Sequence, residues 1–290
     1  MLYKLHDQSF MPDASPRTDW YRSNVWTKDG PDTPVTFYTD WATPEAVTTP
    51  RLDGVRRVAV LLEPPTIYDE FYQIVERDPA LFDLVCSHHA AFVAADPARR
   101  AWYPYGTTWI HDPADRREHA KPKVLSLIAS AKTSAPGHQV RHATAARLLG
   151  RVDLFGRGYR PVAKKVEALG PYMFSVVTEN CRAPWFFTEK LIDALLTWTV
   201  PIYWGFPGVE RVFDPAGFLL ADSIEGLLEH AARALREGPA LYARMRPAVA
   251  ENFRRAQAYL APDAWIASRL DALFAGERFA PGPTPAPESA

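Results

Sequence analysis

Hydrophobic residues in the first half of the chain form short unbroken runs that alternate with amphipathic stretches. Residues 58–62 are the first such run, which ends at Glu63 before a Pro-Pro pair, and they predict a buried β-strand. Apolar residues then recur at helical spacing over residues 67–75, and residues 81–86 predict another strand. One more strand is expected over residues 35–41. This order of strand, helix and strand indicates a parallel sheet.

The same alternation resumes after a charged segment, residues 112–123, so we place a boundary between two domains there, at 1–118 and 119–275. Strands are predicted at residues 124–130, 152–155, 174–178, 200–204 and 218–221, and helices at 138–149, 161–169, 188–198 and from a capping box at Asp222 and Glu225 to Glu237. This order favours a doubly wound α/β fold. Residues 276–290 are rich in proline and are predicted to form a disordered tail.

Composition and charge are those of an ordinary globular protein. The 290 residues are 47% hydrophobic and 23% charged, which argues against disorder throughout the chain. The 33 Lys and Arg residues nearly balance 34 Asp and Glu residues, which leaves a net charge of −1. We therefore expect no nucleic acid as a partner, and any bound anion must be met by local charges.

The cysteines and the apolar segments bear on where the protein works. Cys86 and Cys181 lie too far apart in the sequence for the paired spacing of a zinc site or a disulfide framework, which favours a reducing compartment. Residues 1–10 mix charged and apolar side chains, and the most apolar segment, residues 191–204, is shorter than a membrane span and contains Asp193. We therefore expect a cytoplasmic protein without an integral membrane segment.

Several polar side chains follow the predicted strands, where ligands bind in open α/β sheets. They are Glu63, Arg141, the pair Glu179 and Asn180, and the segment Thr188, Glu189 and Lys190. A helix N-terminus and Lys190 would attract a phosphate, and Glu189 suits a pair of sugar hydroxyls. Together these residues predict an anion site with a base. Taken singly, these residues also have plainer explanations. Thr188 can be an N-cap on a solvated turn, Arg141 can be a surface arginine, and Glu63 can cap the end of a strand.

Several familiar motifs are absent from the sequence. There is no Walker-type P-loop, no GxGxxG after a strand and no GxSxG elbow, which disfavours ATP hydrolysis and a standard dinucleotide cofactor. His138 and His142 have the spacing of a helical zinc pair, but they lack the glutamate that a metalloprotease carries after the first histidine. Because no Asp-x-Asp occurs either, we expect no metal, and Arg141, Lys190 and a helix end would balance leaving-group charge.

One long block of sequence resembles a known enzyme family. The block comprises FSVVTEN at 174–180, FTEKLID at 187–193, VPIYWG at 200–205 and FDP at 213–215. It closely resembles the nucleotide-binding block of the family 10 glycosyltransferases, the α1,3/4-fucosyltransferases. The strong likeness extends over residues 124–228, and a weaker one over residues 58–109.

This resemblance implies a GT-B type of fold, in which two Rossmann-like domains face each other across a cleft. It implies that the C-terminal domain binds GDP-fucose and that a glycan acceptor enters from the N-terminal domain. Arg141 and Lys190 would then contact the diphosphate, Glu189 the ribose or the fucose, and Asn180 would shape the donor pocket. Glu179 and Thr188 belong to the same donor-binding set.

Two further positions follow from the resemblance. Glu63 matches the family's general base, a role that requires its pKa to be raised toward neutrality by apolar neighbours. Phe186 stands where tyrosine is common, so a hydroxyl contact to the donor is lost. Three interpretations remain, none of which needs a cofactor or a metal. They are an inverting fucosyltransferase acting on the 3-hydroxyl of GlcNAc or glucose, a transferase of another GDP-sugar, and a nucleotide-sugar-binding protein without turnover.

Overall fold

The computed structural model describes residues 2–8, 23, 25–104, 106–279 and 281, and the chain divides into two compact units. The first unit combines Met1–Tyr105 with Ala261–Pro281, and the second combines Gly106–Leu260 with Gly282–Ala290. The division therefore falls before the charged segment rather than within it. It also differs from the predicted domains in assigning the last helices of the chain to the first unit.

Within the described residues, the first unit is built on a six-stranded parallel sheet in the order β2-β1-β3-β4-β5-β6. Its strands are β1 (Tyr3–His6), β2 (Trp26–Thr27), β3 (Val35–Thr39), β4 (Arg56–Leu61), β5 (Leu84–Ser87) and β6 (Arg100–Trp102). Strands β3, β4 and β5 confirm the sequence-based predictions. The pattern predicts no strand at β1, β2 or β6, because runs of two to four residues are too short to show a period.

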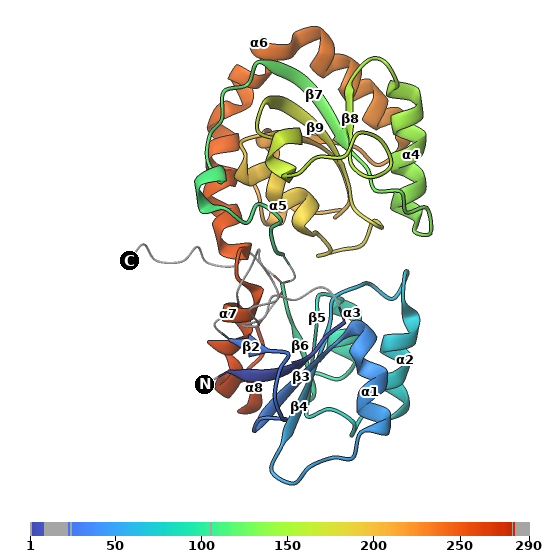
Figure 1. Ribbon diagram of the computed structural model, residues 1–290, viewed down its shortest axis with the longest axis vertical. Coiled ribbons are helices and arrows are strands. Elements are labelled where there is room, and N and C mark those ends of the chain that lie inside the picture. The colour runs from blue at the N-terminus through green and yellow to red at the C-terminus, as the bar shows by residue number, and fades with distance from the viewer. Residues whose placement is uncertain (1, 9–22, 24, 105, 280, 282–290) are drawn as a thin grey trace. The chain divides into compact units, whose positions relative to one another are not determined.

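Helices cover both faces of this first sheet. Helices α1 (Thr43–Thr48), α2 (Asp69–Arg77) and α3 (Ala90–Ala95) lie on one face, and α7 (Pro262–Ala267) and α8 (Leu270–Phe274) lie on the other (Figure 1). Trp265 of α7 meets the rings of Trp102 and Tyr103 edge-on, with centroids 6.2 and 5.5 Å away. Because neither face of the sheet meets water, β4 is apolar at successive positions rather than at alternate ones.

The second unit, over its described part, holds a five-stranded parallel sheet in the order β11-β10-β9-β7-β8. Its strands are β7 (Lys123–Ile128), β8 (Asp153–Phe155), β9 (Tyr172–Thr178), β10 (Val200–Trp204) and β11 (Leu219–Leu220). All five confirm the predicted strands, with ends that differ by at most two residues. Every residue of β10 is buried, as expected of a strand with a neighbour on each side.

Three helices flank the second sheet, namely α4 (Pro136–Leu148), α5 (Glu189–Leu196) and α6 (Ile224–Ala256). Helix α6 packs against α4 and α5 and against strands β7, β9 and β10. The helix predicted at residues 161–169 is wrong, because only a 3₁₀ turn forms there, at Lys165–Ala168. Its apolar positions extend over too few turns to stabilise an α-helix.

The last predicted helix needs a correction at its start but not at its predicted end. The N-cap of α6 is Ser223, whose hydroxyl accepts the backbone N–H three residues later at 3.2 Å, and not Asp222. Its predicted end at Glu237 is confirmed, because the helix breaks at Gly238, with φ 35° and ψ −114°, and a second helical segment continues from Pro239. A proline is tolerated at the start of a helical segment because its missing N–H would have no partner there.

The first residues of the predicted disordered tail are instead held against the first unit. The guanidinium of Arg278 donates hydrogen bonds to the carbonyl oxygens of Pro97 and Ala98, at 2.7 and 2.5 Å. Residues 280 and 282–290 of the predicted tail lie outside the described residues.

The strand orders define one topological switch point in each sheet. In the second sheet the chain passes from β7 to β8 on one side and then to β9 on the other side of β7. In the first sheet it passes from β1 to β2 and then to β3 on the other side of β1. Crevices that bind ligands form at the carboxyl ends of such strand pairs, so the β7/β9 and β1/β3 edges are the places to expect them.

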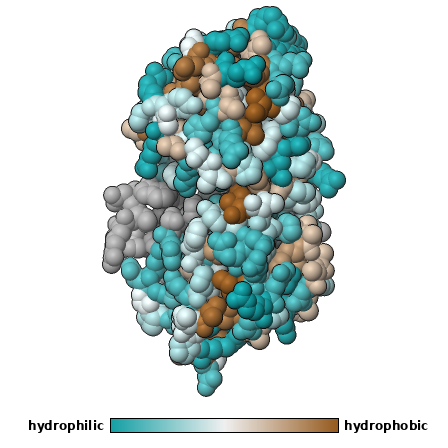
Figure 2. Space-filling model, turned by 90° about the vertical axis from the view of Figure 1, so that its right-hand side faces the viewer, coloured by the Kyte–Doolittle hydropathy of each residue, from teal (hydrophilic) through white to brown (hydrophobic). Residues whose placement is uncertain are grey.

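The face in Figure 2 is mostly hydrophilic, with small separate hydrophobic patches. No helix in the described part of the chain combines the length and the hydropathy that crossing a membrane requires. Cys86 and Cys181 are both buried and form no disulfide, and burial raises the pKa of Cys86 to about 12.

Helix α4 approaches the end of β9 so closely that Gly137 has no room for a side chain. The N–H of Gly137 donates to the carbonyl oxygen of Asn180 at 2.8 Å, and a Cβ at Gly137 would lie 1.8 Å from the carbonyl oxygen of Glu179. Since neither of these backbone oxygens can be moved alone, the position requires glycine.

We expect Gly137→Ala to lower the free energy of unfolding by about 1–3 kcal/mol, because the added methyl group forces α4 away from β9. Urea denaturation would measure this loss. Gln139→Ala, an exposed change on the same helix, is the matched control and should alter stability by less than about 0.5 kcal/mol. Equal stability of Gly137→Ala and the wild type would contradict the close packing.

Candidate functional site

The carboxyl edge of the second sheet, at the β7/β9 switch point, gathers most of the predicted site residues. These are Arg141 in α4, Glu179 and Asn180 directly after β9, Phe186 in the following loop, Thr188 at the N-cap of α5, and Glu189 and Lys190 in its first turn. The remaining predicted residue, Glu63, belongs to the first unit and follows β4.

The carboxylate of Glu179 determines where α5 begins. It is fully buried, and its two oxygens accept hydrogen bonds from the backbone N–H and the hydroxyl of Thr188, at 3.0 and 2.7 Å. The Thr188 hydroxyl in turn accepts the N–H of Lys190 at 3.3 Å. Burial raises the pKa of Glu179, whereas the charge of Lys190 lowers it. The plainer explanation of Thr188 as an N-cap is thus confirmed, but the cap is buried rather than solvated.

Lys190 lies among oxygen atoms at the start of this helix. Its Nζ is 3.0 Å from the Thr188 hydroxyl, 3.2 Å from Glu189 Oε1 and 3.7 Å from Glu179 Oε2. Its side chain is 21% exposed. The ammonium is therefore oriented by protein groups while it still reaches solvent, as a cation that meets an anionic ligand must.

Glu189 is a strongly stabilised carboxylate. Burial by itself would raise the pKa of Glu189, but the charges of Lys190 and Lys165 outweigh burial and lower it to about 2. Lys165 reaches this point from the 3₁₀ turn, with its Nζ 2.6 Å from Asp193 Oδ2 and 3.3 Å from the Glu189 carbonyl oxygen. The sequence analysis missed Lys165, because its position in a predicted helix suggested only a solvated side chain.

Arg141 is a buried residue, so its explanation as a surface arginine is wrong. It is 5% exposed, and its guanidinium donates through Nε to the hydroxyl of Thr178 and through Nη2 to the carbonyl oxygen of Thr178, both at 2.7 Å. Burial lowers the pKa of Arg141, and the charges of Glu179 and Glu189 oppose that effect. The guanidinium is therefore fixed at the carboxyl end of β9 within the same charge cluster.

His138 is a second site residue that the sequence analysis did not assign, since it weighed this histidine only as a metal ligand. Its Nδ1 accepts the N–H of Ala135 at 3.0 Å, so the neutral ring carries its proton on Nε2. Burial and then the charges of Arg141 and Lys190 lower the pKa of His138 to about 4. A hydrogen bond with Asn180 acts in the opposite direction and raises this pKa. The sequence signal that could have identified His138 was its position in the first turn of a predicted helix that follows a predicted strand.

Phe186 contributes apolar packing to this unit. Its side chain is 1% exposed. The backbone N–H of Phe186 donates to the carbonyl oxygen of Ala183 at 3.2 Å, which fixes the loop between β9 and α5.

Charge is nearly balanced in this cluster of the second unit. Three cations, Arg141, Lys165 and Lys190, face three carboxylates on Glu179, Glu189 and Asp193. The N-termini of α4 and α5 lie at the same edge and add partial positive charge. The arrangement can hold a phosphate through Arg141 and Lys190 and accept hydroxyl groups at Glu189.

Glu63 lies at the carboxyl end of β4 and is linked to a buried aspartate. Its backbone N–H donates to Asp40 Oδ2 at 3.2 Å, Leu62 donates to Asp40 Oδ1 at 2.8 Å, and Tyr72 donates to the Glu63 carbonyl oxygen at 3.0 Å. Burial raises the pKa of Asp40 well above its usual range, and the negative charge of Glu63 raises it further. The sequence analysis missed Asp40 because it fell inside a predicted strand.

Metal ligands do not cluster in the described residues, where no group of three or more His, Cys, Asp and Glu side chains could hold an ion. His138 and His142, the pair considered as zinc ligands in the sequence, belong to no such group in the described residues. The Nε2 of His142 lies 3.1 Å from the carbonyl oxygen of Lys132.

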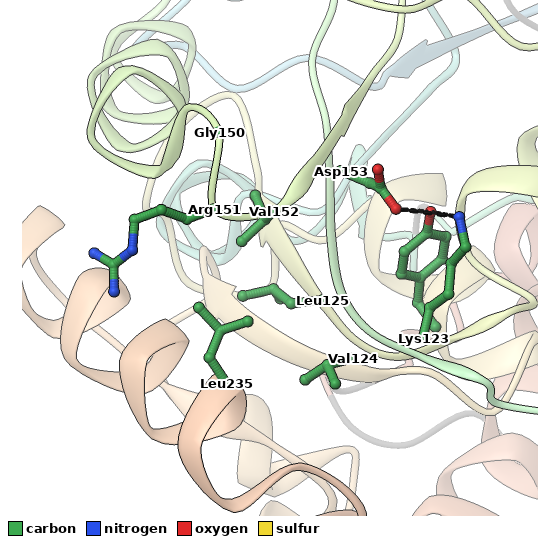
Figure 3. Close-up of a pocket in the computed structure, with 9 residues that line it drawn as sticks. Lys123, Val124, Leu125, Gly150, Arg151, Val152, Asp153 and Leu235 are labelled. Atoms are coloured by element: carbon green, nitrogen blue, oxygen red, sulfur yellow. Dashed lines mark hydrogen bonds and ion pairs between the residues drawn. The ribbon is translucent and has the colours of Figure 1, made fainter.

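A cavity of about 520 Å³ lies at the opposite, amino-terminal end of the strands of the second sheet (Figure 3). Lys123, Asp153 and Tyr172 form hydrogen bonds along one side of it, at 2.6–3.2 Å. None of the predicted site residues lines it. It therefore gives a useful location for control substitutions.

The chain was compared with known proteins. No protein-family model matches it. A curated relative, the α-(1,3)-fucosyltransferase FucT of Helicobacter pylori, is 44% identical over 62 residues, which are 21% of this chain and 13% of that protein. A crystal structure of α1,3-fucosyltransferase with GDP aligns with 78% of this chain and 72% of its own, at 19% identity and a TM-score of 0.44.

A further solved structure establishes the fold. The UDP-forming α,α-trehalose-phosphate synthase from Burkholderia xenovorans aligns over 81% of this chain and 72% of its own, with a TM-score of 0.54 at 15% identity. Two parallel sheets, each flanked by helices, are thus the GT-B fold of glycosyltransferases, as predicted. The predicted resemblance to the family 10 glycosyltransferases is confirmed by the local match to FucT.

We expect Glu189→Gln to destabilise the ligand-free protein in a pH-dependent way. The folded-state pKa of about 2 lies below the usual value of ~4.3, so this carboxylate stabilises the protein above pH ~4.3, and the stabilisation disappears as the pH falls toward 2. Urea denaturation should show a deficit on the order of 1–3 kcal/mol at pH 7 that shrinks below pH ~4.

The matched control for this variant is Glu225→Gln, which changes an exposed carboxylate in the first turn of α6. It should give a small difference from the wild type at every pH. A deficit of Glu189→Gln that stays constant between pH 3 and 7 would contradict the ion pairs of Glu189.

Proposed function

We propose that this protein is an inverting glycosyltransferase that moves L-fucose from GDP-fucose to a hydroxyl group of a glycan acceptor. The observation that carries the proposal is the meeting of Arg141, Lys190 and Glu189 at the switch point of the second sheet. The 62-residue similarity to an α-(1,3)-fucosyltransferase supports the choice of sugar. A 3-hydroxyl of GlcNAc or glucose is the proposed acceptor group.

In the proposed donor complex, the two phosphates of GDP lie against Arg141 and Lys190, aided by the N-termini of α4 and α5. Glu189 accepts hydrogen bonds from ribose or fucose hydroxyls, which a carboxylate with so low a pKa does without taking up a proton. Asn180 and the Nε2–H of His138 complete the polar lining. Glu179 and Thr188 position these groups rather than contact the donor, because their own polar atoms bind each other.

The proposed reaction is a single displacement at the anomeric carbon. The acceptor oxygen attacks as the bond to the GDP oxygen breaks, which inverts the configuration, and Glu63 takes the proton of the acceptor hydroxyl. Arg141 and Lys190 stabilise the negative charge that builds up on the departing diphosphate. We propose a cytoplasmic setting for this reaction, consistent with two buried cysteines that form no disulfide.

A different GDP-sugar is the second candidate donor, and Phe186 is the observation that favours it. Its buried ring offers no hydroxyl to the donor at a position where family members commonly have tyrosine. Release of GDP from a panel of GDP-sugars, with and without glycan acceptors, would identify the donor. Tight GDP binding without turnover of any GDP-sugar would instead indicate a binding protein.

We expect Lys190→Ala and Arg141→Ala each to weaken GDP binding by about 10-fold or more, because each removes a charged hydrogen-bond donor to phosphate. Isothermal titration calorimetry would measure the dissociation constant. Lys123→Ala is the matched control, since it removes a lysine at the opposite end of the same sheet. Wild-type affinity in both site variants would refute the donor site.

We expect Glu63→Gln to lower kcat by at least about 100-fold with little change in the Kd for GDP, because only proton transfer is lost. Glu76→Gln, which alters an exposed carboxylate of the same unit, is the matched control and should keep full activity. An unchanged kcat for Glu63→Gln would eliminate this carboxylate as the base.

A further inference from the structure

The first unit has its own switch point, between β1 and β3, and an exposed tryptophan lies there. Trp41 follows β3 by two residues and is 38% exposed, whereas its neighbours Asp40 and Ala42 are buried. At the end of β1, the amide of Gln8 donates to the Trp41 carbonyl oxygen at 3.3 Å, so both strand ends meet at this residue. A large aromatic side chain open to solvent at such a crevice fits a binding role better than a core role.

The Trp41 ring is held in place rather than loosely exposed. It meets the rings of Tyr68 and Phe71 edge-on, with centroids 4.8 and 5.0 Å away. The backbone before it is fixed because the Asp40 carboxylate accepts the N–H groups of Leu62 and Glu63. A rigid ring loses little freedom when it binds a ligand.

The candidate base belongs to the same edge of the sheet. Asp40 connects the start of the Trp41 turn directly to the backbone of Glu63, as described above. Tyr68 is half-buried beside them, and burial followed by the charge of Glu63 raises the pKa of its hydroxyl. An aromatic surface and a carboxylate are therefore adjacent within one rigid unit.

This pairing matches the chemistry of a sugar ring. One face of a pyranose presents C–H groups that pack on an aromatic ring, and its edge presents hydroxyl groups that donate to carboxylates. We propose that Trp41, supported by Tyr68, forms the platform on which the pyranose ring of the acceptor stacks with its reacting hydroxyl toward Glu63. This assignment rests on the proposed function and adds the place where the acceptor sugar binds.

The full-length Trp41→Ala protein tests the platform by steady-state kinetics with GlcNAc- and glucose-terminated glycans. We expect the KM for the acceptor to rise by roughly 10- to 100-fold, the loss typical of one stacked ring. The Kd for GDP and the slow release of GDP in the absence of acceptor should not change. Trp41→Phe and Tyr68→Phe keep a ring and should keep a KM within about 5-fold of the wild-type value.

The matched control is Val47→Ala, another exposed apolar residue of the first unit, which should leave the KM unchanged. Circular dichroism and the thermal midpoint would show whether Trp41→Ala is folded, and Trp41→Phe provides a second, milder change. If the wild type transfers the sugar and Trp41→Ala has the same KM for the acceptor as the wild type, the platform is overturned while the proposed function stands.

Saturation-transfer NMR of methyl β-GlcNAc and methyl β-glucoside, with GDP present, gives a readout that does not depend on turnover. We expect signals from the C–H face of the sugar with the wild type and weaker ones with Trp41→Ala. Equal signals with both proteins, or none with the wild type, would overturn the platform. The proposed function fails separately if the wild type binds no GDP or transfers no sugar.

Discussion

The contact between the buried Glu179 carboxylate and Thr188 underlies the whole arrangement of the second unit's edge. It joins the end of β9 to the first turn of α5 and thereby directs Glu189 and Lys190 toward the switch point. Two glycines pack so closely on Glu179 that neither has room for a side chain. A Cβ at Gly137 would lie 1.8 Å from the Glu179 carbonyl oxygen, and one at Gly205 would lie 2.7 Å from the Glu179 Cγ. Segments far apart in the sequence thus have one packing requirement in common.

Charge balance is the second principle of this edge. A buried cation without a partner is costly, and the charges of Glu179 and Glu189 act on both the buried Arg141 and the partly buried Lys190. The same carboxylates would repel a diphosphate, and the helix N-termini and the exposed part of Lys190 offset that repulsion. In the proposed donor complex, Lys190 would therefore face both its own carboxylates and the phosphates of the donor.

The sequence predicts those features that depend on neighbours along the chain. Long apolar strands such as β4 and β9 were identified because their burial on both faces gives continuous hydrophobic runs. Glu179 and Asn180 were found because they directly follow a strand, and Thr188, Glu189 and Lys190 were found because they open the next helix. Short strands β1 and β2 gave no period, and the helix predicted at residues 161–169 had too few turns.

Features that depend on tertiary contact escaped the sequence analysis for the same physical reason. The roles of Asp40, Lys165 and His138 come from groups distant in sequence, namely the N–H groups after β4, Asp193 and Asn180. The hydrogen bonds of the buried Arg141 in α4 likewise go to Thr178 at the end of β9, 37 residues away in the sequence. Local spacing cannot reveal such partners, which exist only once the sheet has assembled.

Division of the chain also has a consequence for the order in which the protein folds. Helices α7 and α8 complete the first unit but follow the second unit along the chain, so one face of the first sheet stays uncovered until residues 261–281 have been made. Residues 106–260 supply all the helices and strands of the second unit in one stretch, and that unit can close on the ribosome first. The first unit therefore begins before the second unit in the sequence but is completed after it, and one face of its sheet is exposed in the meantime.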